Sequence, residues 1–173
     1  MIRSILLGGG CFWCTESVFG ALKGVQSVVS GYAGGSADTA NYQAVCTGTT
    51  GHVEVVQVVY DDAIISLEQI LAVFFATHDP TTPNRQGNDI GTQYASVIFY
   101  EDNTDKAIAE QMINKLIADG VPVVTRLEPA PKFYPAESYH QNYFANNPTQ
   151  PYCNFTIPPK LAKLRASFAE LLK

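Results

Sequence analysis

Short apolar runs bounded by glycine, proline or polar residues recur along the chain. They cover residues 2–7, 26–32, 53–60 and 95–100. The third run is rich in valine, whose branched side chain packs well on a pleated surface. Runs of this length that end in turn residues predict four β-strands. A weaker apolar segment at 123–127 adds a candidate edge strand.

Segments with helical spacing of apolar side chains lie between these runs and after them. They predict helices over 12–22, after Ser66, over 109–117 and over 160–172. Ser66 and Gln69 have the spacing of a capping box, in which each side chain bonds the backbone N–H of the other residue. The apolar positions that follow recur at intervals of three and four residues: Leu67, Ile70, Leu71, Phe74 and Phe75.

The order of these elements is β-α-β, β-α-β and then α-β. Two β-α-β units in tandem are typical of a ferredoxin-like two-layer α/β sandwich, an α+β fold, here with one additional helix and strand. The chain has no internal repeat, low-complexity tract or linker, so we expect residues 1–173 to form a single catalytic domain. Residues 130–159 contain six of the ten prolines and little periodicity, which predicts an irregular segment wrapped over the surface before the last helix.

The connection from His78 to Gln93 lacks periodicity and is unusually long for a compact domain. It contains two prolines and two glycines, at 80, 83, 87 and 91, and several polar residues with short side chains. Connections of this length are usually functional or disordered. In a chain this compact, we interpret the connection as functional.

Composition excludes several classes of function. Of the 173 residues, 46% are hydrophobic and 16% are charged, which is incompatible with global disorder. The net charge of −5 and the absence of a lysine or arginine run argue against binding to nucleic acid or to anionic membranes. No apolar stretch has the length of a bilayer, and no signal sequence is recognisable, so we expect a cytoplasmic protein. Nothing in the sequence requires an oligomer, and we expect a monomer.

Cysteine usage points to thiol chemistry. The four cysteines are too few for a disulfide framework, and two of them form the pair Cys11-x-x-Cys14. Cys11 follows three glycines at a predicted strand-to-helix junction, where free backbone N–H groups favour a thiolate. The glycine run does not fit a dinucleotide fingerprint, because Trp13 stands where the third glycine is needed. Phe12 and Trp13 are candidate walls of an apolar pocket, although all three residues would also suit a buried core.

The partner of Cys11 is less certain from the residues alone. Cys14 lies one helical turn away and is placed to resolve an oxidised Cys11 or to share a metal with it. Zinc needs four ligands, and the sequence has no second Cys-x-x-Cys and no paired histidines, so we expect no metal. Cys153 lies in the predicted wrapping segment, which is free to bring it toward an oxidised partner. Cys46 follows Val45 in a short segment and is interpreted as packing.

Other candidate residues carry weaker signals. Glu54 begins the valine-rich strand and is either exposed at the strand end or held in an apolar site, where burial would raise its pKa and make it a proton donor. Asp89 lies in the long connection. The phenols of Tyr42, Tyr94 and Tyr152 lie in or beside loops, where packing and catalysis are both compatible with their position.

Several motifs together resemble one family, the peptide-methionine (S)-S-oxide reductases, or A-type methionine sulfoxide reductases. The matching blocks are GCFW at 10–13, GYAGG at 31–35, GHVEV at 51–55, HDPT at 78–81, RQGNDIGTQY at 85–94 and FYPAESYHQ at 133–141. They occur in the family's order and, with the Tyr152-Cys153 pair, span residues 8 to about 153. The family's fold is an elaborated ferredoxin-like sandwich, as expected from the order of elements.

The resemblance implies a role for each matching residue. Cys11 corresponds to the nucleophile and Glu54 to the acid that protonates the sulfoxide oxygen. Tyr42 and Tyr94 correspond to phenols that bond this oxygen, and Asp89 to a carboxylate of the same polar site. Phe12 and Trp13 correspond to the pocket for the sulfoxide methyl group, and Tyr152-Cys153 to a Tyr-Cys pair whose cysteine resolves Cys11.

The resemblance also implies the overall reaction. Methionine S-sulfoxide, free or in oxidised proteins, is reduced to methionine, and the resulting disulfide is recycled by thioredoxin without metal or organic cofactor. Two positions depart from the common pattern. Cys14 stands where many members have glycine and others have a resolving cysteine, so Cys153, which we rank first, and Cys14, which we rank second, remain alternatives for the resolving cysteine. Ala95 replaces an arginine that commonly follows the GTQY block.

Three alternatives to this function remain open on the sequence. The first is a thioredoxin-like dithiol–disulfide oxidoreductase that uses Cys11 and Cys14 alone. The second is a zinc-binding module without enzymatic activity. The third is a cysteine hydrolase in which His140 serves as the base.

Overall fold

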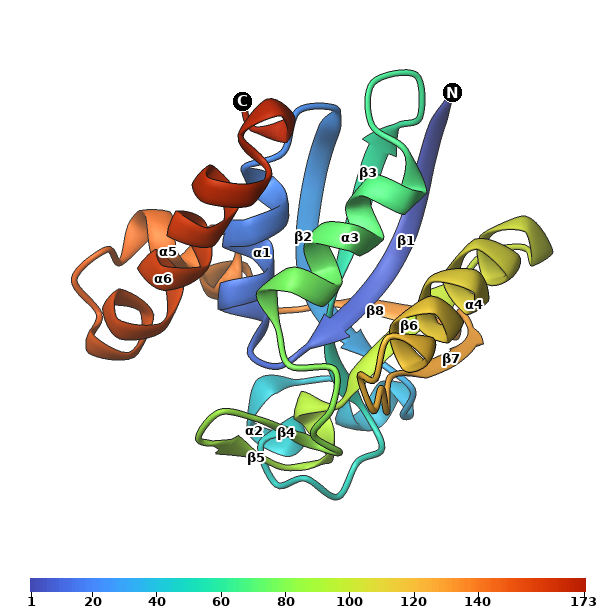
Figure 1. Ribbon diagram of the computed structural model, residues 1–173. Helices are drawn as coiled ribbons and strands as arrows, with labels where there is room; N and C mark the ends of the chain where they lie inside the picture. Colours follow the sequence, from blue (N-terminus) through green and yellow to red (C-terminus); the bar gives the residue numbers. More distant parts are fainter.

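The computed structural model describes residues 1–173 and has one six-stranded, curled sheet as its centre (Figure 1). The sheet order is β7-β6-β1-β3-β2-β8. All neighbouring strands are antiparallel except β6 and β7, which are parallel. The strands are β1 (Ile2–Gly9), β2 (Val25–Ala33), β3 (Val53–Asp61), β6 (Ser96–Tyr100), β7 (Arg126–Pro129) and β8 (Phe133–Pro135).

Helices and one small hairpin surround this sheet. The α-helices are α1 (Phe12–Gly20), α2 (Tyr42–Val45), α3 (Leu67–Thr77), α4 (Asn103–Ala118), α5 (Tyr143–Asn146) and α6 (Pro151–Ser167). Four 3₁₀ turns are η1 (Ala37–Thr39), η2 (Thr92–Tyr94), η3 (Ser138–His140) and η4 (Ala169–Leu171). The hairpin consists of β4 (Arg85–Gln86) and β5 (Asp89–Ile90). No helix has the combination of length and hydropathy needed to span a membrane.

The ferredoxin-like arrangement predicted from the element order is confirmed. In the central strand order β6-β1-β3-β2, helix α1 connects β1 to β2 and helix α3 connects β3 to β6. Each connection passes over a strand that lies between the two it joins, which is the split β-α-β topology. Strands β7 and β8 extend the two edges, so the additional edge strand is also confirmed.

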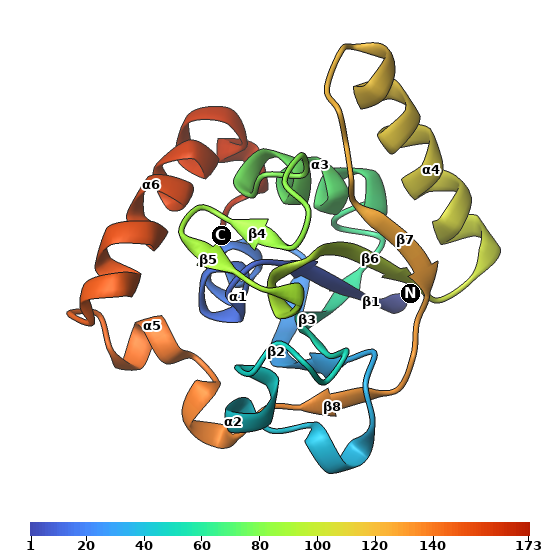
Figure 2. The same cartoon turned by 90° about the horizontal axis from the view of Figure 1, so that it is seen from below.

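Two hydrophobic cores cover the two faces of the sheet. The larger cluster has 23 buried residues and packs α1 and α3 against β1, β2 and β3. The smaller cluster of seven buried residues lies on the other face, where Ala130 and Phe133 pack against it. Figure 2 shows the chain running from β7 at one edge of the sheet to β8 at the other. This crossing segment is the structural form of the predicted wrap.

Strand β8 leads the wrapped segment back to the site described below. It pairs with β2 at Gly31, where a β-carbon would lie 2.4 Å from the Phe133 ring and 2.5 Å from the Tyr134 carbonyl oxygen. Glycine is therefore required at position 31 for the close approach of the two strands. Two residues after β8, Glu137 accepts hydrogen bonds from the Tyr32 hydroxyl at 2.8 Å and from the Tyr42 N–H at 2.9 Å.

The prediction that 130–159 is irregular and that the last helix covers 160–172 is wrong in its boundary. Helix α6 begins at Pro151 and includes Pro158 and Pro159. Pro151 suits the first helical position, since its missing N–H has no helical partner there, and the Gln150 side chain caps the helix by accepting from the Cys153 N–H. The two internal prolines leave the carbonyls of residues 154 and 155 free on the exposed side, where water can bond them.

The buried side of α6 explains why the helix continues through these prolines. Cys153, Ile157 and Leu164 are fully buried, and Leu161 packs beside them. Their spacing of four, four and three residues places them on one helical face. The chain after α6 turns into η4 and does not remain α-helical to residue 172.

Candidate functional site

The site lies where β1 ends and α1 begins. Cys11 is the N-cap of α1, and its carbonyl accepts the Cys14 N–H at 3.1 Å. Gly10 has a φ of +95°, and a β-carbon there would lie 2.8 Å from the Gln86 side chain. The glycine before Cys11 therefore serves a left-handed turn packed against the β4–β5 hairpin. This explains the glycine run without a phosphate loop.

Glu54 is buried beside the first turn of α1. It is the second residue of β3, and the Phe12 N–H donates to its Oε1 at 3.1 Å. The residue is buried, with an exposure of 2%. Burial raises the pKa of Glu54 to about 8, the Phe12 hydrogen bond opposes this rise, and the nearby Asp89 charge adds to it. The carboxyl is therefore protonated at neutral pH, and the buried alternative for Glu54 is the correct one.

Cys11 and Cys14 form a hydrogen-bonded pair of thiols. The hydrogen bond from Cys11 lowers the pKa of Cys14 to about 7, with further support from Thr156 and Lys160. The Thr156 hydroxyl lies 3.5 Å from the Cys14 sulfur. The same pairing, with burial and the Glu54 charge, raises the pKa of Cys11.

As expected for a helix start, the backbone N–H of Trp13 lowers the pKa of Cys11, but the pairing with Cys14, burial and the Glu54 charge together raise it. The free N–H of Phe12 at the start of α1 is taken by Glu54, so it is not available to the Cys11 sulfur. The lowered pKa of Cys14 places the shared negative charge first on Cys14, whose pKa is also lowered by the charge of Lys160. Cys11 keeps its proton until that proton moves along the hydrogen bond to Cys14.

The aromatic residues next to Cys11 occupy different environments. Phe12 is fully buried and packs between Tyr32, Tyr42 and His140, with ring centroids 5.6, 6.5 and 5.1 Å away. Trp13 is half-buried. Its ring stacks on Tyr143 with centroids 3.9 Å apart, and its Nε1–H donates to His140 Nδ1 at 3.0 Å. Phe12 thus supports the site from beneath, whereas Trp13 lies at its edge.

Tyr42 and Tyr94 lie within electrostatic range of both Glu54 and Cys11. Tyr42 begins α2, and Tyr94 ends η2. Burial is the main cause that raises the pKa of both phenols, and the charges of Glu54 and Cys11 raise both further. Both groups therefore remain protonated hydrogen-bond donors beside the acid and the thiol.

Asp89 and Tyr152 line a groove on the other side of Cys11. The Tyr152 hydroxyl donates to Asp89 Oδ2, which joins α6 to the β4–β5 hairpin. The groove has a volume of about 480 Å³ and contains both Cys11 and Cys14 in its wall. The long connection predicted to be functional supplies one side, over residues 86–89, and α6 supplies the other.

The two remaining cysteines differ in exposure. Cys153 is fully buried in a cluster with Cys14 and Ile157, and burial, with the Cys14 charge, raises its pKa to about 11. Cys46 is exposed, so the prediction that it is a packing residue is wrong. The reason is that the short helix α2 buries Val45 and leaves its C-cap, Cys46, on the outside. All four cysteines are free thiols.

The histidines have structural partners, and no group of three or more histidine, cysteine or acidic side chains is placed to hold a metal ion. His52 accepts from the Gly35 N–H and bonds the Ser36 carbonyl, and His78 bonds the Phe74 carbonyl and the Ser96 hydroxyl. His140 is bonded to Trp13 and not to Cys11. The arrangement required of a His140-activated hydrolase is therefore missing.

Two polar residues near the site were not identified from the sequence. Glu137 holds the backbone of Tyr42, and Lys160 lines the groove beside Cys14. Neither has a periodicity or spacing that distinguishes it from a surface charge. Only the pairing of β8 with β2 and the extension of α6 to Pro151 bring them to the site.

The raised pKa of Glu54 predicts a pH-dependent stability. Between pH 4.5 and about 8, Glu54 keeps its proton in the folded protein and loses it in the unfolded chain. The contribution of Glu54 to the free energy of unfolding is therefore fully present below pH 4.5 and is lost as the pH rises to about 8. Glu54→Gln removes the titration and keeps an oxygen for the Phe12 N–H. We expect its free energy of unfolding, relative to wild type, to increase by roughly 2–4 kcal/mol between about pH 5 and pH 8.

Denaturant unfolding at several pH values measures this difference. Glu170→Gln, on an exposed carboxyl, makes the same charge change and serves as the control. A difference between Glu54→Gln and wild type that stays constant with pH would show that Glu54 is ionised in the folded protein.

Comparison with known proteins agrees with this site and fold. The family model described as "Peptide methionine sulfoxide reductase" matches residues 3–172. A protein of Psychrobacter cryohalolentis named "Peptide methionine sulfoxide reductase MsrA" is 61% identical over 171 residues, which cover 99% of each chain.

Solved structures show the same similarity. Mxr1 from Saccharomyces cerevisiae in reduced form has a TM-score of 0.80 and 37% identity, covering 86% of this chain and 87% of that one. Mxr1 in complex with Trx2 has a TM-score of 0.57 and 27% identity, covering 82% and 84%. Because the family model and the relatives span nearly the whole sequence, this chain belongs to the peptide methionine sulfoxide reductase A family, whose members are oxidoreductases.

Proposed function

We propose that the protein reduces methionine S-sulfoxide, free or in proteins, to methionine, with Cys11 as nucleophile and Glu54 as proton donor. The observation that carries this proposal is the protonated Glu54 carboxyl, buried at the first turn of α1 beside the Cys11 thiol. Cleavage of a sulfur–oxygen bond by a thiol needs a proton on the departing oxygen. A carboxyl whose pKa is about 8 supplies that proton at neutral pH.

The first step joins these two groups. As the Cys11 sulfur attacks the sulfoxide sulfur, its own proton passes along the hydrogen bond to the Cys14 thiolate. The attack forms a transient bond between the two sulfurs, and Glu54 protonates the sulfoxide oxygen. The hydroxyl then passes to the Cys11 sulfur as both the methionine S–O bond and the transient S–S bond break. The products are methionine and a Cys11 sulfenic acid, so the substrate sulfur is reduced and the Cys11 sulfur is oxidised.

Neighbouring side chains stabilise this step. Tyr42 and Tyr94 donate hydrogen bonds to the sulfoxide oxygen, where negative charge develops. Their raised pKa values keep both phenols protonated. Trp13 contacts the sulfoxide methyl group over the buried ring of Phe12, and the Asp89–Tyr152 pair binds the substrate on the groove side.

The second step forms a disulfide, and the geometry favours Cys14 over Cys153 as the first resolving cysteine. Cys14 is hydrogen-bonded to Cys11 and has a pKa of about 7, whereas the Cys153 thiol is buried and its pKa is about 11. Cys153 lies in the same apolar cluster as Cys14, which is suited to a relay in which Cys153 attacks the first disulfide. Thioredoxin then reduces the final disulfide, as the complex of the similar Mxr1 with Trx2 supports.

An activity assay with a methionine sulfoxide substrate and dithiothreitol tests the first step. We expect no methionine from Cys11→Ser, because the nucleophile is missing. We expect turnover by Glu54→Gln to fall by about 10²–10⁴-fold, the usual contribution of a general acid. Cys46→Ser is the matched control for removing a thiol outside the mechanism and should retain wild-type turnover.

Activity of Cys11→Ser at the wild-type rate would reject the proposed nucleophile. A dithiol–disulfide oxidoreductase would instead reduce disulfide substrates and form no methionine. A zinc-binding module would bind stoichiometric zinc and lose its fold with a chelator.

Replacing dithiothreitol with thioredoxin tests the resolving step. We expect Cys14→Ser to form about one methionine per enzyme and then stop, because its Cys11 sulfenic acid lacks the adjacent thiolate. Cys153→Ser should form the Cys11–Cys14 disulfide after the first turnover, which peptide mapping by mass spectrometry detects. Continued turnover of Cys14→Ser together with arrest of Cys153→Ser before any disulfide forms would show that Cys153 resolves directly.

A further inference from the structure

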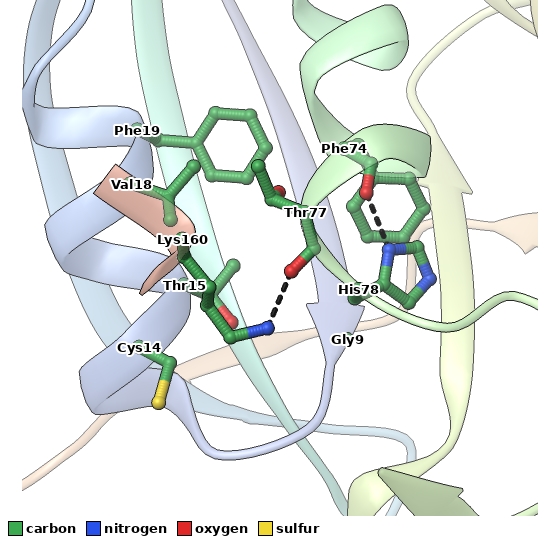
Figure 3. Close-up of a pocket in the computed structure, with 9 residues that line it drawn as sticks. All are labelled: Gly9, Cys14, Thr15, Val18, Phe19, Phe74, Thr77, His78 and Lys160. Atoms are coloured by element: carbon green, nitrogen blue, oxygen red, sulfur yellow. Dashed lines mark hydrogen bonds between the residues drawn. The ribbon is translucent and has the colours of Figure 1, made fainter. Parts of the chain in front are cut away.

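Lys160 has an unusual environment for a lysine. It comes from the middle of α6, and its side chain reaches past the first turn of α1, where its Nζ donates to the carbonyl oxygen of Thr77 at the end of α3 (Figure 3). Lys160 lines the groove that contains Cys11 and Cys14, and also the small pocket between α1 and α3. Its ammonium is thus directed into the molecule, away from the open surface.

The ammonium lacks a carboxylate partner. None of the ion pairs in the protein includes Lys160, and the Thr77 carbonyl is its one protein acceptor, although an ammonium has three N–H donors. Charges held away from bulk water are normally paired. Burial lowers the pKa of Lys160, and the sulfurs of Cys14 and Cys11 oppose this shift. The negative charge that acts on the Lys160 ammonium therefore comes from these two sulfurs.

The other groups around Cys14 are accounted for elsewhere. Cys11 is its hydrogen-bonded partner, Glu54 is protonated and bonded to Phe12, and Asp89 is bonded to Tyr152. The remaining titratable side chains that face Cys14 or Lys160 are Tyr152, Cys153, His78 and Lys163. His78 is neutral, since burial lowers its pKa to about 4, and Lys163 is on the exposed side of α6. Lys160 is therefore the cation that lines both the groove and the small pocket together with Cys14.

We propose that Lys160 is a positioning residue whose ammonium, fixed by the Thr77 carbonyl, is the counter-ion that holds Cys14 as a thiolate facing Cys11. This inference rests on one part of the proposed function, namely that Cys14 is the resolving cysteine. In the resolving step, the Cys14 thiolate attacks the sulfur of the Cys11 sulfenic acid. Cys14 returns to the thiolate by releasing the proton that it received from Cys11 in the first step. The new S–S bond then forms as the S–O bond breaks, and the leaving hydroxide takes up a proton in place of the one released and becomes water. Cys14 is oxidised and the Cys11 sulfur is reduced, so no further oxidant is needed.

The pH dependence of Cys14 alkylation tests this assignment directly. Reduced protein without substrate is treated with iodoacetamide at a series of pH values, and the labelled cysteines are quantified by peptide mass spectrometry. Only the thiolate reacts, so the midpoint of the profile reports the ionisation of Cys14. We expect Lys160→Met to move this midpoint upward by about one pH unit and to slow Cys14 labelling about tenfold near pH 7.

Matched variants separate the charge from its structural contact. Lys160→Arg keeps a cation and should retain most of the wild-type profile. Lys160→Gln keeps an N–H donor for the Thr77 carbonyl but lacks the charge, so it should behave as Lys160→Met and provides a second neutral variant if the methionine variant does not fold. Lys163→Met removes an exposed charge one turn along α6 and should leave the midpoint unchanged.

The outcomes distinguish this inference from the proposed function. An unchanged Cys14 midpoint in the neutral Lys160 variants, or the same shift in Lys163→Met, would overturn the role of Lys160. If Lys160→Arg shifts the midpoint as much as Lys160→Met, the role of Lys160 as a counter-ion is also overturned. The shift would then come from the packing of the lysine side chain, because arginine keeps the positive charge. A shifted midpoint combined with thioredoxin-driven turnover of Cys14→Ser would instead support the counter-ion and reject Cys14 as the resolving thiol.

Discussion

The hydrogen bond between the Phe12 N–H and the buried Glu54 carboxyl is the interaction on which the site depends. It joins the first turn of α1 to the start of β3 and satisfies two polar groups that have no access to water. A carboxylate would be costly at this depth, so the protein keeps the group protonated and the proton becomes available for chemistry. The same bond takes the Phe12 N–H away from the Cys11 sulfur, whose pKa is lowered by the Trp13 N–H and raised by the neighbouring Cys14.

The ferredoxin-like topology brings these groups together from distant parts of the sequence. Strands β1 and β3 are neighbours in the sheet, so the end of β1, with Cys11 after it, lies beside the start of β3, with Glu54. The connection between α3 and β6 adds Asp89 and Tyr94, and α6 adds Tyr152 and Lys160 from the opposite side. In the proposed function, the sheet and the connection from α3 to β6 thus supply the proton donors, and α6 supplies Lys160 and Cys153 for thiol exchange.

Much of this arrangement could be predicted from the sequence. The valine-rich run, the capping box of Ser66 and Gln69 and the order of the elements indicated the sheet and its topology, because periodicity and turn residues are local signals. Motif resemblance indicated Cys11 and Glu54 as site residues. The burial of Glu54 was not predictable from its strand position alone, since the first residues of a strand are exposed or covered according to what packs over them.

The remaining features arise from contacts distant in sequence. The prolines at 158 and 159 suggested an irregular segment, whereas packing of Ile157 and Leu164 against α1 and the core maintains a helix through them. The exposure of Cys46 follows from the shortness of α2. Lys160 resembled any helical surface lysine until the path of α6 placed its ammonium beside Cys14.

The most direct test of the account is infrared difference spectroscopy of the reduced protein, which detects the C=O stretch of a protonated carboxyl. The account predicts such a band at pH 7 in wild type, its absence in Glu54→Gln, and its loss as the pH is raised through about 8. A reduced protein without a Glu54-dependent protonated carboxyl at pH 7 would contradict the central claim that Glu54 is the stored proton donor.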